Sequence, residues 1–122
     1  MDVLAKVGGL DIAGMAGCYL GIAASGKTAV IDGFISSVAA LAAVHICPYA
    51  RDYMLASHRS AEPGAAAALN AVGLEALLDG DMHLGEGSGA VMFLPLLEEA
   101  LLIYNRLPNF DEGNVETYEE YK

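Results

Sequence analysis

The stretch TAVIDGFISS, residues 28–37, predicts that a buried strand turns directly into a helix. The short apolar run at residues 28–31 is typical of a strand covered on both faces of a parallel sheet. Asp32-Gly33 ends this strand. Ser36 or Ser37 can then cap a helix, because hydroxyl oxygens accept the free amide hydrogens of a first helical turn.

The alternation of helix and strand continues on both sides of this stretch. A helix of small residues precedes it and ends at Gly26, and Pro48 ends the helix that follows it. A third helix is expected to begin with Ser60 as its N-cap and to end at Gly73. The expected helices cover residues 10–24, 36–47, 60–73 and 90–107, and the expected strands cover 28–31, 53–56 and, more weakly, 74–78.

This order predicts an α/β fold with parallel strands. Because so few strands are expected, the chain is interpreted as the C-terminal half of a doubly wound, Rossmann-like parallel sheet with flanking helices. We expect one domain over residues 1–107 and an acidic C-terminal tail over residues 108–122. Helical spacing predicts one apolar face on the last helix, formed by Ala90, Leu94, Leu97, Leu101 and Tyr104.

Polar residues gather where the expected strands end. They lie in three segments, Asp32-Gly33, residues 57–60 and residues 81–89. Because ligands of open α/β sheets bind at the carboxyl ends of the strands, these three junctions are expected to share one pocket.

The composition excludes several classes of function. The chain has 122 residues and a formal net charge of −10, whereas nucleic-acid binding needs a basic surface. Its longest weakly polar run, residues 12–26, is too short for a membrane span and is interrupted by glycines. The N-terminus lacks the basic start and apolar block of a signal peptide. We therefore expect a soluble, cytoplasmic protein that binds neither nucleic acid nor membrane.

Neither a disulfide framework nor a metal site is expected. Cys18 and Cys47 fall in apolar helical patterns and are interpreted as buried free thiols. Asp79, Asp81 and Glu86 lack the spacing of a calcium-binding loop. No motif implies a cofactor.

Residues 21–28, GIAASGKT, match the phosphate-binding loop pattern G-x-x-x-x-G-K-[ST] at every position. That loop needs a strand before it and a helix after it, so that the helix N-terminus faces the phosphates. Here the expected order is reversed. Gly26 is interpreted as a helix stop and Lys27 as a cation favourable near a helix C-terminus. A nucleoside triphosphatase is therefore the less favoured alternative.

Ser60 and His58 together raise the possibility of a hydrolase. Two residues this close on one turn need not meet, and the G-x-S-x-G pattern is absent around Ser60 and Ser88. We therefore interpret Ser60 as a helix cap that can also bind a phosphate or sugar oxygen, and His58 as a surface or core histidine. His45, on an apolar helix, is interpreted as structural.

The stretch LGEGSG, residues 84–89, places a carboxylate between glycines. The glycines allow a tight backbone and the close approach of a flat ligand. Glu86 would repel a phosphate, but it can accept a proton, especially if apolar side chains such as Leu84 and Met82 cover it. From spacing alone, a general base and an ordinary acidic turn residue are equally favoured.

Four longer segments occur in a fixed order: GGLDIA (8–13), VIDGFISS (30–37), ASHRSAEPG (56–64) and LGEGSGA (84–90). Together they resemble the C-terminal part of the nicotinate-nucleotide:dimethylbenzimidazole phosphoribosyltransferase family, or CobT family. The resemblance extends to about Leu107. Several long motifs in order make it more specific than the isolated phosphate-loop pattern.

Members of that family move the phosphoribosyl group from nicotinate mononucleotide to 5,6-dimethylbenzimidazole, releasing nicotinate. The product, α-ribazole 5′-phosphate, becomes the nucleotide loop of cobalamin. The resemblance implies a doubly wound parallel sheet, a homo-oligomer, usually a dimer, and no metal or cofactor.

The resemblance also implies roles for individual residues. Glu86 would be the general base that takes the benzimidazole N–H proton, and Leu84 would pack against that base. Asp32, Gly33 and Ser60 would contact the ribose-phosphate side of the nucleotide. The implied substrate-binding residues are Asp32, Gly33, Ser60, Leu84, Gly85 and Gly87.

Family members are much longer than this chain, and the part before Gly8 carries other phosphate contacts and part of the benzimidazole pocket in them. We therefore interpret the chain as the C-terminal portion, a fragment or one part of a split enzyme. Its composition, 55% hydrophobic, agrees with apolar faces that the rest of the enzyme covers and predicts self-association. A catalytic chain and a non-catalytic fragment or interaction module both stay open.

Overall fold

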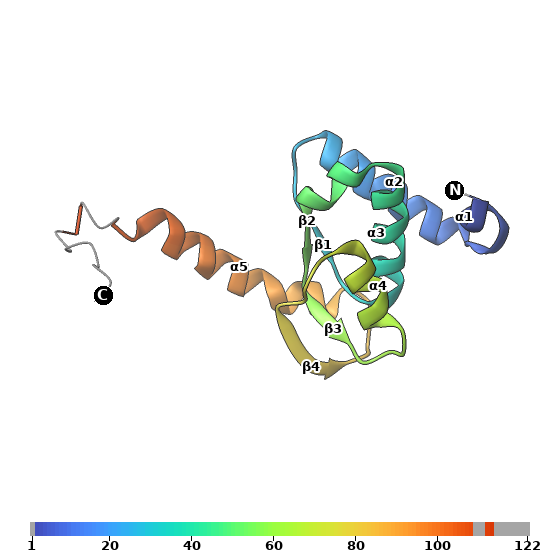
Figure 1. The fold of residues 1–122 in the computed structure, drawn as a ribbon. Helices are drawn as coiled ribbons and strands as arrows, with labels where there is room; N and C mark the ends of the chain where they lie inside the picture. Colours follow the sequence, from blue (N-terminus) through green and yellow to red (C-terminus); the bar gives the residue numbers. More distant parts are fainter. Residues whose placement is uncertain (1, 109–111, 114–122) are drawn as a thin grey trace, which may run out of the picture.

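Four short strands form two parallel pairs in the computed structural model, which describes residues 2–108 and 112–113. β1 (Ala29–Ile31) pairs with β2 (Met54–Ala56), and β3 (His58–Ser60) pairs with β4 (Leu78–Met82). Because only Ser57 separates β2 from β3, one extended segment runs through both pairs (Figure 1). The parallel pairing confirms the predicted α/β fold class.

Helices rich in alanine and glycine supply most of the core. α2 (Leu10–Ala24) packs against α3 (Phe34–Ile46), and α3 packs against α4 (Ala65–Val72). The other described helices are α1 (Asp2–Val7), the 3-10 helix η1 (Pro48–Tyr53) and α5 (Ser88–Arg106). The alanines at positions 39, 40 and 43 of α3 are fully buried, because a methyl side chain lets neighbouring helices approach closely.

The start of α3 corrects the predicted cap. Gly33 is the N-cap, so the helix begins at Phe34, earlier than predicted, and Ser36 and Ser37 lie inside its first turn. The Ser36 hydroxyl reaches back and accepts hydrogen bonds from the amides of Asp32 (3.1 Å) and Gly33 (2.9 Å). The serine therefore stabilises the strand-to-helix turn from within the helix.

The prediction that Ser60 caps the third helix is wrong. Ser60 is the last residue of β3, and the next amide, that of Ala61, donates a hydrogen bond to the Met82 carbonyl at 2.9 Å. Pairing with β4 thus keeps this segment extended. The helix begins only after Gly64, whose φ of +89° is a left-handed conformation that suits glycine. It ends at Gly73, as predicted.

The third predicted strand lies further along the chain than expected. β4 covers Leu78–Met82, so Asp79-Gly80-Asp81, which come after the predicted strand over 74–78, are part of the strand. Aspartate and glycine have low strand propensity, so the sequence does not predict a strand here. Pairing with β3 keeps the segment extended.

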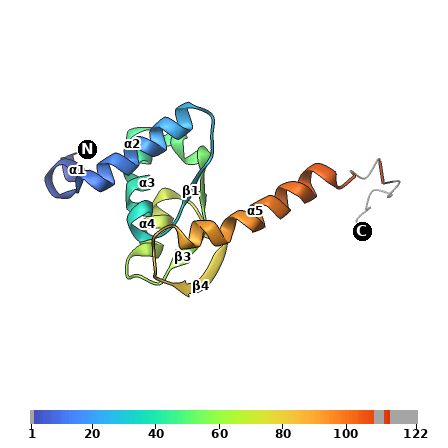
Figure 2. The same ribbon diagram turned by 180° about the vertical axis from the view of Figure 1, so that it is seen from behind.

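α5 projects away from the rest of the molecule in both views (Figures 1 and 2). Its buried residues are Gly89 and Phe93, both near its N-terminal end. Of the apolar face predicted on this helix, Leu94 and Leu101 are exposed, and Tyr104 is 84% exposed. Helical periodicity identifies an apolar stripe but not whether another element of the same chain covers it.

The structure also gives the exposure of the two cysteines and of His45. Cys18 is exposed and Cys47 half-buried, so both are free thiols but Cys18 is not buried. His45, interpreted as structural, is exposed on α3.

The structure has the order of elements that argued against a phosphate-binding loop. α2 ends at Ala24, Gly26 has a left-handed φ of +68°, and β1 follows at Ala29. The element directly after Lys27 is this strand, so the loop does not lead into a helix as the phosphate-binding pattern requires. Among the described helices, none is long and apolar enough to span a bilayer.

Candidate functional site

A cavity of about 420 Å³ lies where the three polar junctions meet. Its wall includes Asp32-Gly33 after β1, His58 and Ser60 of β3, and residues 83–87 before α5. The expectation that these junctions share one pocket is therefore confirmed. All the residues named as candidate catalytic or substrate-binding groups line it: Asp32, Gly33, Ser60, Leu84, Gly85, Glu86 and Gly87.

The Asp32 carboxylate holds the loop that carries Glu86. Its Oδ2 accepts a hydrogen bond from the Gly87 amide at 3.1 Å, and its Oδ1 accepts one from the Ala90 amide at 2.9 Å. Gly87 is the N-cap position of α5, and it has no side chain of its own to fill that role. Asp32 therefore caps α5 from a distant part of the chain, and its negative charge suits the positive end of the helix.

Glu86 sits in an unusual backbone conformation. Its φ is +58°, and Gly85 and Gly87 on either side have φ values of +76° and +80°. A left-handed conformation costs a residue with a Cβ atom about 1–2 kcal/mol. Such strain persists where the surroundings hold it, and here the two hydrogen bonds to Asp32 do so.

Glu86 is open to solvent, and the predicted apolar cover is not formed by its neighbours. Leu84 is 77% exposed, and Met82 is only half-buried. The loop therefore presents an apolar side chain and a carboxylate at the rim of the cavity, both free to contact a flat ligand.

The buried Ser60 hydroxyl turns toward Glu62. It donates to Glu62 Oε2 at 3.1 Å and accepts a bond from the Glu62 amide at 3.4 Å. This places a hydroxyl and a second carboxylate on one wall of the cavity.

His58 is a cavity residue whose environment the sequence analysis left undecided. It is only 6% exposed, its Nδ1 lies 3.0 Å from the Ser57 Oγ, and a Cβ atom built on Gly89 would overlap its ring. Strand alternation could have predicted this position, because residues 58 and 60 of a strand face one way and residue 59 faces the other. The segment was interpreted as a turn into a helix, which hid that alternation.

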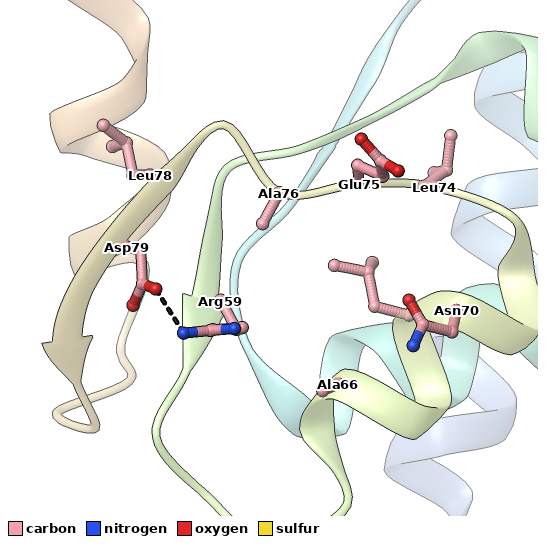
Figure 3. A pocket seen from close by; sticks show the side chains of 9 residues that line it. Arg59, Ala66, Asn70, Leu74, Glu75, Ala76, Leu78 and Asp79 are labelled. Carbon is pink, nitrogen blue, oxygen red and sulfur yellow. Dashed lines mark hydrogen bonds and ion pairs between the residues drawn. The ribbon is translucent and has the colours of Figure 1, made fainter.

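Arg59 faces away from this cavity, as the alternation requires. Figure 3 shows its guanidinium directed at Asp79 of β4, with which it forms an ion pair. Both side chains are more than half exposed, so the pair contributes about 0–1 kcal/mol to stability. They border a smaller hollow of about 280 Å³.

α2 supports the site through Tyr19. Burial raises the pKa of the Tyr19 hydroxyl, and the nearby Asp32 carboxylate and Cys18 thiol raise it further, while a hydrogen bond with Ser36 opposes the rise. Tyr19 is thus neutral at physiological pH beside the carboxylate that caps α5. Within residues 2–108 and 112–113, no three His, Cys, Asp or Glu side chains are grouped so as to hold a metal ion.

Comparison with known proteins assigns this arrangement to a family. A family model described as a phosphoribosyltransferase, DBI_PRT, matches residues 1–115. The chain belongs to this phosphoribosyltransferase family. The match covers all the residues that line the cavity.

Individual relatives within this family are more specific than the family model. The nicotinate-nucleotide–dimethylbenzimidazole phosphoribosyltransferase of Desulforamulus reducens is 50% identical over 115 residues, which are 94% of this chain and 33% of that protein. The protein of the same name from Escherichia coli strain ATCC 8739 is also 50% identical, over 94% of this chain and 32% of its own length. The chain thus spans about a third of these relatives.

Solved structures agree with the sequence match. The crystal structure of the enzyme of that name from Thermus thermophilus superposes with a TM-score of 0.87 at 43% identity, over 95% of this chain and 35% of that chain. A second structure, CobT from the same organism, gives a TM-score of 0.86 over 93% of this chain. The predicted resemblance to the CobT family is therefore confirmed, together with the fold.

Proposed function

We propose that this chain is part of an enzyme that transfers the phosphoribosyl group of nicotinate mononucleotide to 5,6-dimethylbenzimidazole. The observation that carries the proposal is the position of Glu86 at the rim of the cavity, in the middle of three consecutive residues with left-handed backbone conformations. Glycines on both sides leave room for a planar base to lie against the loop. The names of the relatives supply the two substrates.

In this reaction a benzimidazole nitrogen attacks the anomeric carbon of the ribose. The bond from that carbon to nicotinate breaks, and its electron pair stays on the nicotinate ring nitrogen. The N–H proton of the benzimidazole passes to the Glu86 carboxylate, which acts as general base. Leu84 packs against the incoming base.

The opposite wall of the cavity takes the nucleotide. Gly33 and Ser60 provide backbone and hydroxyl groups for the ribose phosphate, whereas Gly85 and Gly87, on either side of Glu86, contact the planar base. Asp32 contributes a fixed negative charge near the ribosyl centre, which gains positive charge in the transition state. Its two oxygens already accept the amides of Gly87 and Ala90, so it acts through its charge and through the position of the loop.

Release of nicotinate from nicotinate mononucleotide in the presence of 5,6-dimethylbenzimidazole tests the proposal. The Glu86→Gln variant is compared with Glu98→Gln, which changes an exposed glutamate on α5 outside the cavity. Loss of the general base is expected to slow release by about 100-fold or more, whereas Glu98→Gln is expected to match the parent. Equal rates for both variants would remove Glu86 from the mechanism.

Because the chain spans about a third of its relatives, the assay has two arms. In one the chain is alone, and in the other it is mixed with the portion of the Desulforamulus reducens enzyme that it does not match. Release only in the second arm means that the remaining portion supplies required groups. Release in neither arm, from folded proteins that still bind each other, contradicts the proposal.

The exposed apolar surface of α5 favours a second function, that of an interaction module. Leu101, Leu102 and Ile103 are each about half exposed on one projecting helix. Surfaces of this kind are typically covered by another chain. We propose a cytoplasmic homo-oligomer in which these side chains are covered, and sedimentation of the chain across a range of concentrations tests it.

A further inference from the structure

The buried Ser57 hydroxyl determines where the proton of His58 lies. Ser57 Oγ is 2.7 Å from the Ile31 carbonyl oxygen and 3.2 Å from the Asp32 carbonyl oxygen. Carbonyl oxygens only accept, so the single hydroxyl hydrogen must be donated to them. The 3.0 Å contact between Ser57 Oγ and His58 Nδ1 then needs a hydrogen from the ring.

The other ring nitrogen of His58 is left without a protein partner. Among the described residues, no fully buried side-chain nitrogen or oxygen lacks a hydrogen bond, and His58 Nε2 makes none. It is therefore not fully buried. The Cε1–Nε2 edge of the ring lies toward Gly33, and both residues line the cavity.

From this geometry we infer that the uncharged form of the His58 imidazole is the Nδ1–H tautomer, and that its Nε2 then accepts a hydrogen bond from a ligand in the cavity. The matching group on the ligand is an O–H or N–H donor. On the proposed function, which this inference extends, the two sources are a ribose hydroxyl of the nucleotide and the N–H of the benzimidazole. His58 is thus a substrate-binding residue, and Ser57 is the residue that positions its proton.

The surroundings make this tautomer a stable feature of the fold. Ser57 is fully buried, and the ring of His58 packs on Gly89, where any side chain would overlap it. Turning the ring would break the contact between Nδ1 and the Ser57 hydroxyl and disturb the packing of the ring on Gly89.

The tautomer is measured directly by long-range proton–nitrogen correlation of the imidazole rings in the 15N-labelled chain. His58 signals are assigned by their loss in His58→Asn, and exposed His45 serves as the internal reference. A protonated Nδ1 and an unprotonated Nε2 are expected. An Nε2–H form, or a mixture of the two tautomers, overturns the inference whatever the substrate is. Ser57→Ala is expected to shift His58 toward such a mixture, whereas Ser57→Thr retains the hydroxyl.

Ligand binding tests the role of Nε2 and identifies the donor. Nicotinate mononucleotide and 5,6-dimethylbenzimidazole are added separately, and the amides of Gly85 and Gly87 report binding in the cavity. The Nε2 signal is expected to move upfield with the ligand that supplies the donor. His58→Asn is expected to weaken that ligand about 5-fold, the size of one net hydrogen bond, and His58→Gln to weaken it less.

The outcomes separate this inference from the proposed function. Movement of the glycine amides without movement of Nε2 overturns the binding role of His58 and leaves the proposed function intact. If neither ligand moves the glycine amides, the proposed function fails for this chain, and the inference is decided by the tautomer measurement alone.

Discussion

Replacement of Asp32 by alanine is expected to release the loop that carries Glu86. Asp32 accepts hydrogen bonds from two amides that have no other acceptor in the described structure, those of Gly87 and Ala90. A hydrogen bond to a charged acceptor contributes about 1.5–3 kcal/mol when it is buried, but Asp32 is only half-buried. Loss of a helix cap costs about 0.5–2 kcal/mol. We therefore expect Asp32→Ala to lower the free energy of unfolding by about 2 kcal/mol.

Urea denaturation measures this change. With a denaturant slope of about 1–2 kcal/mol per molar urea, the midpoint is expected to fall by about 1–2 M. Asp32→Asn retains one acceptor oxygen and is expected to lose about half as much. The matched control is Asp52→Ala, an exposed carboxylate 3.7 Å from Arg51, which is expected to change stability by less than about 0.5 kcal/mol.

Hydrogen exchange locates the effect. Protection is expected to fall at Gly87 and Ala90 before it falls in β1, because the loop opens while the strand stays paired. If the Asp32→Ala midpoint moves no further than that of Asp52→Ala, or if protection at Gly87 and Ala90 is unchanged, Asp32 does not hold the loop.

Three other changes follow from the same geometry. Gly89→Ala forces a methyl group into the His58 ring and is expected to cost about 1–3 kcal/mol in the urea midpoint, and an unchanged midpoint would refute the packing. Glu86→Gly relieves about 1–2 kcal/mol of left-handed backbone strain, but the added entropy of the unfolded chain costs about 0.4–1 kcal/mol. A small gain of stability is therefore expected, together with loss of nicotinate release. Burial raises the pKa of Tyr19 in the folded protein above 10.0, its value in the unfolded chain. The neutral hydroxyl therefore contributes fully to stability below pH 10.0, and this contribution is lost as pH rises through the folded-state pKa. Stability should therefore fall above pH 10 less steeply in Tyr19→Phe, and parallel curves for the two proteins would count against it.

Local patterns in the sequence identified the elements that depend on neighbouring residues. The apolar run at residues 28–31, the small-residue helix over 10–24 and the glycine stops at Gly26 and Gly73 all act within a few residues, and the structure confirms them. The order of helix and strand also sufficed to predict parallel pairing and to argue against the phosphate-binding loop. The motifs in fixed order identified the family.

The polar site was predicted in outline for a related reason. Ligand-binding groups follow the strands of an α/β fold, so the three junctions could be located without knowing how the strands pair. The roles given to Glu86, Leu84 and Ser60 remain predictions.

Contacts between distant segments could not be predicted from the sequence. Because β3 pairs with β4, Ser60 is the end of a strand and not the helix cap that was predicted. The inward position of His58 follows from the same strand, which the sequence analysis did not predict. The two hydrogen bonds that Asp32 accepts from the start of α5 likewise join residues 55 and 58 positions apart.

The sequence by itself determined the fold class, most of the helices and the three polar junctions that line the cavity, because these depend on near neighbours. Only the tertiary structure decided which amides Asp32 caps, where the proton of His58 lies and how much of α5 is exposed. Each of these depends on two segments meeting in space, and a hydrogen bond has direction and length only once both partners are in place.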